Sequence, residues 1–443
     1  MKRIAIILGA MVLAVSASGQ VLTVSGTSHA AIEIKPETST GLTALYVVDD
    51  TNTATLSYTS TSGSVTWQRY DARGGGFAAD VEGVTRNGNV YSIAAGDADA
   101  GYIIDDGTRR YCFWVVNYAN HRLELDGLGV DMEQSACDRT VLTLTGSADA
   151  ITYYTITGRP VKLSRQMHLQ YRTLSFADGG WTQVENDVEL SDADGYISVI
   201  APLCDTDFRL TGDRFLSAWG EAEDVVSQSY SAIAVSAETD SEQTAHDADN
   251  EGNTGNDGDL GGSAPAEITF TAYITDAVVF KEWQFSNTED FADVRDRYNE
   301  ESITRTFTEE GTTYARFVCA DASGNCVYEG TVYPISIGSS RLDCPNAFSP
   351  ENQDGVNDEW KVSYTSIVSF ECDIFNRWGT KMAHLSHPSQ GWDGRYKGKF
   401  VPSGVYFYVI KAKGADGKSY DKSGDINIIN SRKGASGATT PGE

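Results

Sequence analysis

The feature that most constrains the fold of this chain is a series of short strand-like runs that return about every ten residues. Runs such as TALYVVD, ATLSYTS, YCFWVVNY and TVLTLTG are bounded by Gly, Asp, Asn or Ser. This spacing is typical of β-sandwiches, in which a turn follows each short strand. One weak helical period lies in FADVRDRYNEES, at residues 291–302. The sequence therefore predicts an all-β protein with several immunoglobulin-like β-sandwich modules in tandem.

The length of 443 residues predicts several domains, because one such sandwich uses only about 100 residues. We expect a first β-sandwich module at residues 20–119 and an immunoglobulin-like module at 120–236, with the boundary after the strand that contains Trp114. Strand-like runs resume at Ala266. Residues 266–338 therefore form a third module, which resembles the immunoglobulin-like or PKD-like modules of bacterial surface proteins.

Residues 237–265 separate the second and third modules. This run contains eight acidic residues, no Lys, Arg or aromatic residue, and Leu260 as its one large aliphatic residue. So little apolar surface cannot offset the entropy that is lost when a segment is ordered. The run is therefore expected to be an acidic disordered linker, and ordering by calcium is the alternative.

The N-terminus has the pattern of a secretory signal peptide. The basic start MKR precedes an apolar run from Ile4 to Val15, and the small residues ASG follow. Twelve apolar residues are fewer than the roughly 20 that span a bilayer. Residues 1–19 are therefore expected to direct Sec export, and the mature chain from Gln20 is expected to have no membrane span.

The chain carries 62 acidic and 34 basic residues, which gives a formal net charge of −28 at pH 7. Such a surface repels the phosphates of nucleic acids and anionic lipids, so nucleic acid is not expected as a partner. The excess of acids suits a protein that stays soluble outside the cell. Diffuse binding of divalent cations is the alternative.

Seven cysteines in an exported chain indicate disulfide bonds and one unpaired thiol. One pair flanks a short turn, one lies within a small domain, and one has the separation of an inter-sheet bond in an immunoglobulin-like sandwich. The expected bonds are Cys137–Cys204, Cys319–Cys326 and Cys344–Cys372, which leaves Cys112 as a buried thiol. Spacing alone leaves other connectivities open.

Asn, Gln, Asp and Gly gather in AFSPENQDGVND, at residues 347–358. If this were an EF-hand loop with Gly355 at its sixth position, Pro350 and Lys361 would take the first and last ligand positions, where carboxylates belong. Neither side chain supplies an oxygen. An ordered loop of Asx turns is therefore favoured over a calcium site.

The C-terminus then shows four motifs in order: PNAFSP with DGVND, IFNRWG, GWDG with a later GK, and PSGVYFY. Together they resemble the gliding motility-associated C-terminal domain, the type B sorting domain of the type IX secretion system, from Leu342 to Lys433. The family runs from P-N-G directly into D-G, whereas this chain has PENQDG, which changes one loop. The motif residues are Pro345, Asn346, Phe348, Pro350, Asp354, Gly355, Asn357, Asp358, Asn376, Arg377, Trp378, Gly379, Trp392, Asp393, Gly394, Pro402, Gly404, Tyr406 and Tyr408.

The resemblance implies a β-sandwich sorting domain at residues 339–433, followed by a disordered tail at 434–443. It also implies recognition by the type IX translocon after Sec export, together with a cognate outer-membrane partner. The implied location is extracellular or on the outer-membrane surface. Other surface proteins or glycans are candidate partners of the remaining modules.

The sequence shows little sign of catalytic chemistry. No zinc-protease, nucleophile-elbow, phosphate-loop or dinucleotide motif occurs. His384 and His387 lack a further zinc ligand nearby. Asp205, Asp207 and Asp213 could form a paired-carboxylate site, but in so acidic a chain their closeness is expected by chance. Neither a catalytic residue, a metal nor a cofactor is predicted.

Two classes of function follow. The favoured one is a non-enzymatic modular surface protein that acts in adhesion, or in an envelope assembly linked to secretion or motility. The alternative is a secreted carbohydrate- or protein-degrading hydrolase with its active site in residues 20–236. A deep cleft with a perturbed pair of acids in that region would favour the hydrolase.

Overall fold

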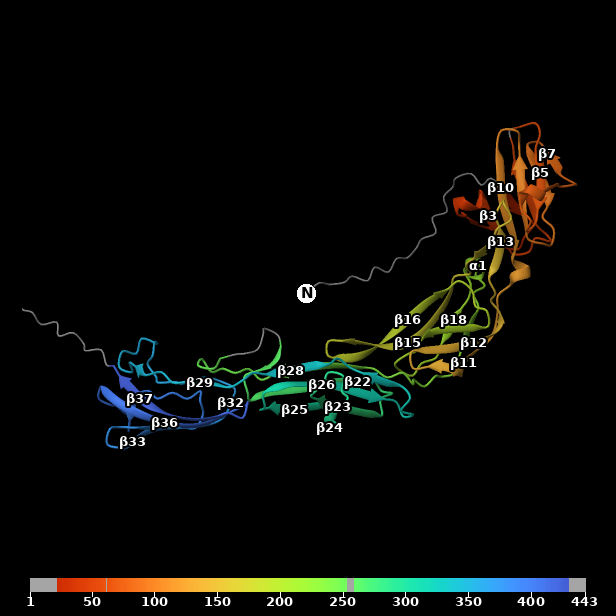
Figure 1. Cartoon of the computed structure of the whole chain (residues 1–443). Helices are drawn as coiled ribbons and strands as arrows, with labels where there is room; N and C mark the ends of the chain where they lie inside the picture. The colour runs from red at the N-terminus through yellow and green to blue at the C-terminus, as the bar shows by residue number, and fades with distance from the viewer. Residues whose placement is uncertain (1–21, 61, 253–258, 430–443) are drawn as a thin grey trace, which may run out of the picture. The chain divides into compact units, whose positions relative to one another are not determined.

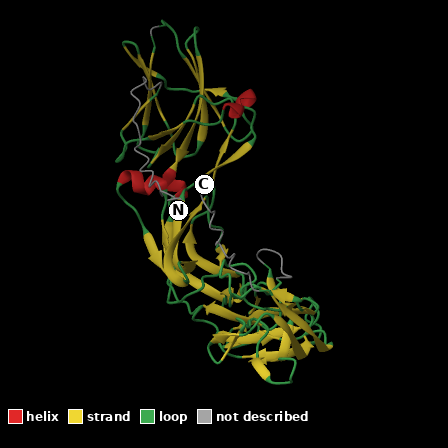
Figure 2. Ribbon diagram, turned by 90° about the vertical axis from the view of Figure 1, so that its left-hand side faces the viewer, coloured by secondary structure: helices red, strands yellow, loops and turns green. Residues whose placement is uncertain are grey.

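The computed structural model describes residues 22–60, 62–252 and 259–429, and strands dominate it (Figure 2). The expected signal peptide and C-terminal tail lie outside these residues. Within the described ranges, no helix is long and apolar enough to cross a membrane. The chain divides into two compact units. The N-terminal unit runs to Thr173 and includes Gln183–Ala232, and the C-terminal unit holds Leu174–Thr182 and the residues from Ile233 onward.

The first sandwich of the N-terminal unit consists of two sheets and short 3-10 turns (Figure 1). One sheet has the order β1 (Thr23–Ser25), β4 (Thr55–Thr59), β8 (Val90–Ala94), β7 (Thr85–Asn87). The other has the order β2 (Ile32–Ile34), β3 (Ala44–Val48), β10 (Arg110–Asn117), β9 (Ala100–Asp105), β5 (Thr66–Tyr70), β6 (Ala79–Asp80). The 3-10 turns are η1 (Thr38–Thr40), η2 (Gly75–Phe77) and η3 (Tyr118–His121).

Strand β3 explains why the run ALYVV is apolar without alternation. All five of its residues are buried. Tyr46 and Val48 contribute to the core of the first sandwich, while Leu45 and Val47 contribute to a second core. A strand that is covered on both faces has no exposed side for polar residues.

The second sandwich supplies most of that second core. Its first sheet has the order β11 (Glu124–Ala136), β12 (Arg139–Ser147), β17 (Tyr196–Ile200). Its other sheet has the order β16 (Gly180–Leu190), β15 (Met167–Ala177), β18 (Arg209–Thr211), β19 (Asp224–Val226). A hairpin, β13 (Ile151–Tyr154) and β14 (Pro160–Leu163), and one helix, α1 (Arg214–Trp219), complete it.

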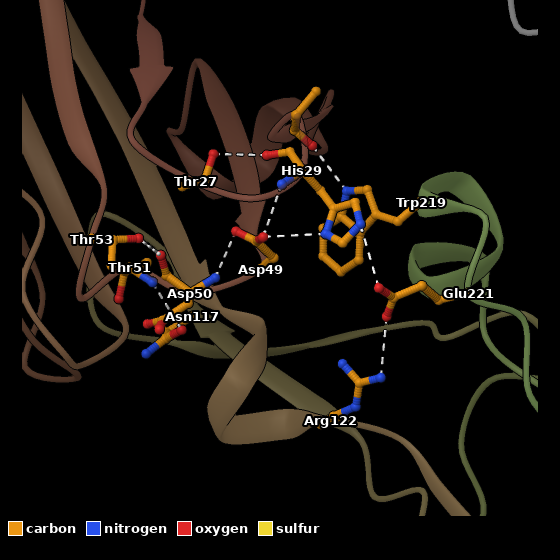
Figure 3. A network of polar contacts seen from close by, with 11 residues as sticks. Thr27, His29, Asp49, Asp50, Thr51, Thr53, Asn117, Arg122, Trp219 and Glu221 are labelled. Atoms are coloured by element: carbon orange, nitrogen blue, oxygen red, sulfur yellow. Dashed lines mark hydrogen bonds and ion pairs between the residues drawn. The ribbon is translucent and has the colours of Figure 1, made fainter.

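A polar cluster ties the first and second sandwiches together within the N-terminal unit (Figure 3). The imidazole of His29 lies between two carboxylates, with Nδ1 3.2 Å from Asp49 Oδ2 and Nε2 3.4 Å from Glu221 Oε1. Its ring stacks on Trp219, the last residue of α1, at a centroid distance of 5.5 Å. The guanidinium of Arg122 also reaches Glu221, at 3.1 Å. These contacts fasten the start of the first sandwich to the helix of the second.

The third sandwich opens the C-terminal unit. Its smaller sheet has the order β20 (Ala237–Gln243), β22 (Ala266–Ile274), β25 (Ser302–Phe307). Its larger sheet has the order β21 (Leu260–Gly262), β28 (Tyr333–Ile337), β26 (Gly311–Ala320), β23 (Phe280–Ser286), β24 (Val294–Tyr298), with β27 (Val327–Glu329) paired to β26. Strand β24 occupies the run in which a weak helical period was noted, because pairing with β23 outweighs local propensity.

The predicted disordered linker at 237–265 is wrong for its described residues, because both of its ends are strands. Residues Ala237–Gln243 pair along their whole length with β22, and Leu260–Gly262 pair with β28. The acids do not prevent pairing because they alternate. In AETDSEQ, Glu238, Asp240 and Glu242 are exposed, while the residues between them face inward. The third sandwich therefore begins at Ala237, and residues 253–258 lie outside the description.

The C-terminal domain, residues 339–429, has one five-stranded sheet, drawn in blue in Figure 1. Its order is β30 (Ala347–Phe348), β37 (Ser419–Ile428), β36 (Gly404–Gly414), β32 (Ile367–Phe375), β33 (Lys381–Leu385). Two small sheets accompany it: β29 (Arg341–Asp343) with β31 (Ser363–Thr365), and β34 (Arg395–Tyr396) with β35 (Lys399–Phe400). The fold class predicted from the sequence is confirmed.

The cysteines depart from the expected scheme. In the part of the chain that the structure describes, thiols lie at Cys112, Cys319, Cys344 and Cys372. Disulfide-bonded sulfurs lie at Cys137 and Cys326. The structure therefore does not contain the expected bonds Cys319–Cys326 and Cys344–Cys372, and the expected bond Cys137–Cys204 stays a prediction.

Strand register and burial account for these differences. Strands β26 and β27 place Tyr328, not Cys326, opposite Cys319. Cys137 lies in the turn between β11 and β12. Burial raises the pKa of the Cys372 thiol to about 12, which keeps it protonated and unreactive.

Candidate functional site on the C-terminal domain

The aromatic residues of the four C-terminal motifs divide into a buried group and an exposed group. Phe348, Trp392 and Tyr406 are buried, and the Trp392 ring contacts the rings of Phe348 and Tyr406 at centroid distances of 5.6 and 5.3 Å. Trp360 is also buried, with its Nε1 donating to Pro345 O at 2.7 Å. Tyr408 packs on Trp360 at 5.2 Å. These residues build the core of the domain.

Other motif residues shape turns around this core. Asn376 Oδ1 accepts from the N–H groups of Trp378 and Thr380, and Gly379 has a φ of +78°, which closes a tight turn after β32. Asp393 Oδ1 accepts from Arg395 N at 3.0 Å. A Cβ on Gly394 would lie 2.7 Å from Pro350 Cγ, so close packing requires glycine there.

The remaining motif positions serve as backbone anchors. Asn346 O accepts from Asn427 N at 2.8 Å, which ties the first motif to β37. Pro402 O accepts from the Tyr406 hydroxyl at 3.0 Å. Gly404 begins β36 at a φ of +151°, a conformation that side-chain-bearing residues rarely adopt.

The Asn- and Asp-rich loop is a set of turns. Asp354 Oδ1 accepts from Val356 N at 3.0 Å, and Asp358 Oδ2 accepts from Gly355 N at 2.8 Å. Asn357 has a φ of +54° and its carbonyl accepts from Ser349 N. The carboxylates thus bind the loop's own amides, as expected for Asx turns. Within the described ranges, no group of three or more His, Cys, Asp or Glu side chains could hold a metal ion.

The exposed motif residues surround a groove of about 410 Å³ at one end of the sheet. Trp378 is 74% exposed, and the guanidinium of Arg377 stacks over its ring at 4.4 Å. Tyr396, Pro402 and Phe407 line the groove beside them. The IFNRWG and PSGVYFY motifs, which are distant in sequence, therefore meet at one surface feature.

The groove continues into an apolar stripe along the central strand β36. Val405, Phe407 and Val409 all point outwards and are 43–46% exposed. The register places Phe375 of β32 beside Phe407, which widens the stripe. A solvated sheet face is normally polar, so a row of exposed apolar side chains on its central strand indicates a contact surface.

Charged groups border this stripe. Asp425 of β37 lies opposite Phe407, and Asp373 of β32 lies opposite Val409. Lys381 and His384 pair with Asp373 at 2.8 and 2.7 Å. The hydrogen bond from Lys381 lowers the pKa of Asp373, so its carboxylate stays ionised at neutral pH. The face is thus an apolar centre with a charged rim, the usual anatomy of a protein interface.

The carboxylates considered for a hydrolase are structural. Asp213 is buried in an ion pair with Arg165, Asp207 pairs with Arg172 at the surface, and Asp205 accepts from a backbone amide. Of the two candidate histidines, His384 belongs to the rim of the apolar stripe, and His387 Nδ1 bonds Ser389 Oγ at 2.7 Å.

The sequence-based interpretation missed the exposed face of β36. The run VYFYVI suggested only an apolar-aromatic strand. The usable signal was that both alternating sets, Val405, Phe407 and Val409 as well as Tyr406 and Ile410, are apolar. In a domain with one sheet of this size, only one of the two sets can be covered by the core. The motif also gave no sign that the Trp378 ring is exposed.

Two segments of the chain match known families. Residues 342–428 match the family described as the CHU_C type IX secretion signal domain, which confirms the resemblance drawn from the motifs. Residues 129–227 match the fibronectin type III domain family, which corresponds to the second sandwich. Neither family is a catalytic kind. The chain is therefore a modular protein with an export signal at its C-terminal end, destined for the cell surface or for secretion. A search of curated proteins finds no match.

Three solved structures show weak similarity, each at 12% identity. Fibronectin(III)-like modules of Clostridium thermocellum CbhA have a TM-score of 0.18, with 42% of this chain and 98% of that chain covered. Dimeric latent PorU from Porphyromonas gingivalis has a TM-score of 0.16, with 72% of this chain and 35% of that chain covered. A Ca2+-stabilized adhesin that helps an Antarctic bacterium bind ice has a TM-score of 0.18, with 93% of this chain and 99% of that chain covered. These TM-scores are too low to support an assignment of fold or function.

Proposed function

We propose that the exposed face of the C-terminal domain is the surface by which the type IX secretion machinery and a cognate outer-membrane partner recognise this chain. The observation that carries the proposal is Trp378. It belongs to a motif of the secretion-signal family, yet it is 74% exposed and contributes to no core. A large aromatic residue held in water by a tight turn has no structural reason to be there, whereas aromatic and arginine side chains are the usual anchors of interfaces.

The three sandwiches are proposed to be the cargo of this signal. Their proposed bounds are 20–119, 120–236 and 237–338, with the third bound moved to the strand that the structure shows. The cargo acts without catalysis, in adhesion or as part of a surface assembly linked to secretion or motility. Support comes from the fibronectin type III match, and from the structural partners of Asp205, Asp207 and Asp213.

The first test removes the signal. A chain truncated after Arg341 is expected to accumulate in the periplasm of a host with a type IX system, since the machinery has nothing to bind. The measurement is the fraction of the protein in periplasm, outer membrane and medium. Surface display of the truncated chain at the level of the full chain would refute the proposal.

The second test targets the face itself in the full chain. Trp378→Ala is expected to reduce export at least tenfold, because interface aromatic anchors typically contribute 2 kcal/mol or more, roughly thirtyfold in affinity. Val327→Ala is the matched control, since this exposed apolar residue, at 56%, lies on the third sandwich. Equal export of the two variants would contradict the assigned face.

A further inference from the structure

A short acidic segment, Asp247–Gly252, crosses from the third sandwich to the C-terminal domain and pairs with the edge of β31. We call this segment the strap. Gly252 N donates to Tyr364 O at 2.7 Å, and Tyr364 N donates to Asn250 O at 3.1 Å, which makes a parallel bridge between Glu251 and Tyr364. Asn250 Nδ2 also donates to Val362 O and Pro388 O at 2.7 and 2.8 Å. The strap thus lies along the free edge of β31 in the small sheet β29–β31 and is joined to it by an isolated bridge.

Glu251 is the side chain that holds the strap in place. Its side chain is only 8% exposed, although it carries a carboxylate. The Tyr364 hydroxyl donates to Oε2 at 3.1 Å, His246 Nδ1 lies 3.0 Å from the same oxygen, and the Ser263 hydroxyl donates to Oε1. A buried carboxylate is tolerated only when its oxygens are satisfied in this way. Glu251 therefore links the strap, β31 and the segment that leads into β22.

The rest of the boundary between the third sandwich and the C-terminal domain is also buried. Ser366 N donates to the Ser263 hydroxyl at 2.8 Å, and Ala264 N donates to the Ser366 hydroxyl at 3.2 Å, with all three residues less than 5% exposed. Val368 and Ala415 of the C-terminal domain pack into the core of the third sandwich. The C-terminal domain therefore contributes side chains to the core of the third sandwich, and the two domains pack directly against each other.

The strap pairs with the C-terminal domain over only a short stretch of its backbone. A cavity of about 710 Å³ lies beside it, lined among others by His246, Asp249, Lys361 and His387. Within the described residues of the strap, only Asn250 to Gly252 pair with β31. Without the strap, β31 would be an open edge with unpaired backbone groups. A single substitution that removes the contacts of the Glu251 carboxylate should therefore expose this edge.

We propose that the export signal of this chain is a composite unit: the type IX domain is presented correctly only when the strap closes β31 and joins the domain to the third sandwich. The inference rests on the proposed function and extends it. The family match covers residues 342–428, so the residues that complete the sheet lie about 90 positions upstream of it. Glu251 is a positioning residue, since it acts through Tyr364 and does not lie on the proposed recognition face.

The test compares full-length variants in a host with a type IX system. Glu251→Ala removes all three contacts, and Glu251→Gln removes the charge while it keeps one acceptor oxygen. Glu242→Ala removes one exposed acid of β20 as a charge-matched control. Gly252→Ala is an independent variant, because a Cβ there would lie 2.6 Å from Thr365 Oγ1 and push the strap off without touching Glu251. The readouts are hydrogen exchange at the Tyr364 and Gly252 amides, and the exported fraction.

We expect Glu251→Ala and Gly252→Ala to speed exchange at these amides at least tenfold and to reduce export several-fold. Glu251→Gln should give an exchange rate and an exported fraction between those of these two variants and the wild type. Glu242→Ala should match the wild type in both. Loss of the folded C-terminal domain in both strap variants would also support the composite unit, because a free-standing domain would stay folded.

Two outcomes would overturn the inference: unchanged exchange in both strap variants, or faster exchange with unchanged export. Failure of the proposed function looks different. In that case the chain truncated after Arg341 is exported, whatever residue stands at position 251.

Discussion

The N-terminal unit and the C-terminal domain differ in one respect: the first buries charged side chains, and the second exposes the ring of a motif tryptophan. The N-terminal unit buries charges: Arg165 and Asp213 form an ion pair at 2.7 Å with side chains 1% and 0% exposed, and Asp106 is 4% exposed. The C-terminal domain builds its core from aromatic rings and places another large ring, Trp378, in water. Buried charges specify one arrangement of a core, and an exposed ring leaves the core unaffected. The contrast separates residues that determine the fold from residues free to serve recognition.

The largest expected effect comes from breaking the buried pair. Asp213 accepts from Arg165 and Tyr118, and its Oδ1 also caps α1 by accepting from Phe215 N and Leu216 N at 3.0 Å. Asp213→Ala leaves the Arg165 charge buried and unpaired, which should cost about 3–5 kcal/mol, and it removes a helix cap worth about 1 kcal/mol.

Denaturant unfolding of the full chain provides the measurement. The transition of the N-terminal unit should shift, while that of the C-terminal unit should not. Asp207→Ala is the control, since its pair with Arg172 is about half exposed and should contribute at most about 1 kcal/mol. Similar shifts in the two variants would show that burial does not make the Asp213 pair contribute more to the free energy of unfolding than the exposed pair does.

The next effect lies in the aromatic core of the C-terminal domain. Trp392 is 3% exposed and contacts Phe348 and Tyr406. Trp392→Ala leaves a cavity that the surrounding rings can fill only partly, at a cost of about 3–5 kcal/mol. The same unfolding experiment should now shift the C-terminal transition and leave the N-terminal one in place. A shift in the other transition would mean that the two units are not independent.

A smaller effect should appear with pH, and mainly in the N-terminal unit. The hydroxyls of Thr108 and Tyr58 and the N–H groups of Thr108 and Arg109 donate to Asp106, which holds its pKa well below the ordinary 3.8. A depressed pKa in the folded state stabilises the protein above pH 3.8, and this stability is lost as the pH falls further.

Thermal unfolding between pH 2 and pH 6 tests this prediction. Asp106→Asn should be less stable than the wild type at neutral pH and should lose less stability on acidification. Asp105→Asn, at the neighbouring exposed position that ends β9, should follow the wild-type curve. Parallel curves for Asp106→Asn and the wild type would show that Asp106 does not contribute to the loss of stability at low pH.

The sequence predicted the all-β class and the C-terminal domain because both depend on local patterns. Alternation in short runs decides strands, and ordered motifs with Trp392, Gly394 and Tyr406 encode a core and its turns. It did not predict the folding of 237–252, because composition averages over the run while strand pairing depends on which side each acid faces. Nor could it show that Trp378 is exposed and Trp392 buried. Both tryptophans stand next to glycine-rich turns, and their exposure is decided by long-range packing.

The smallest expected change in stability therefore carries the most information about function. The Trp378 ring contacts Arg377, and the turn that carries it is held by Asn376 Oδ1 through backbone amides that remain in any variant. Trp378→Ala should shift the C-terminal unfolding transition by no more than about 0.5 kcal/mol. Trp392→Ala, fourteen positions along the chain, should destabilise the same domain several times more. If Trp378→Ala unfolds the domain as strongly, its export defect would be a folding defect and the exposed face would lose its assignment. If the domain stays folded while export falls, the Trp378 ring contributes to export by contacting a partner at the surface.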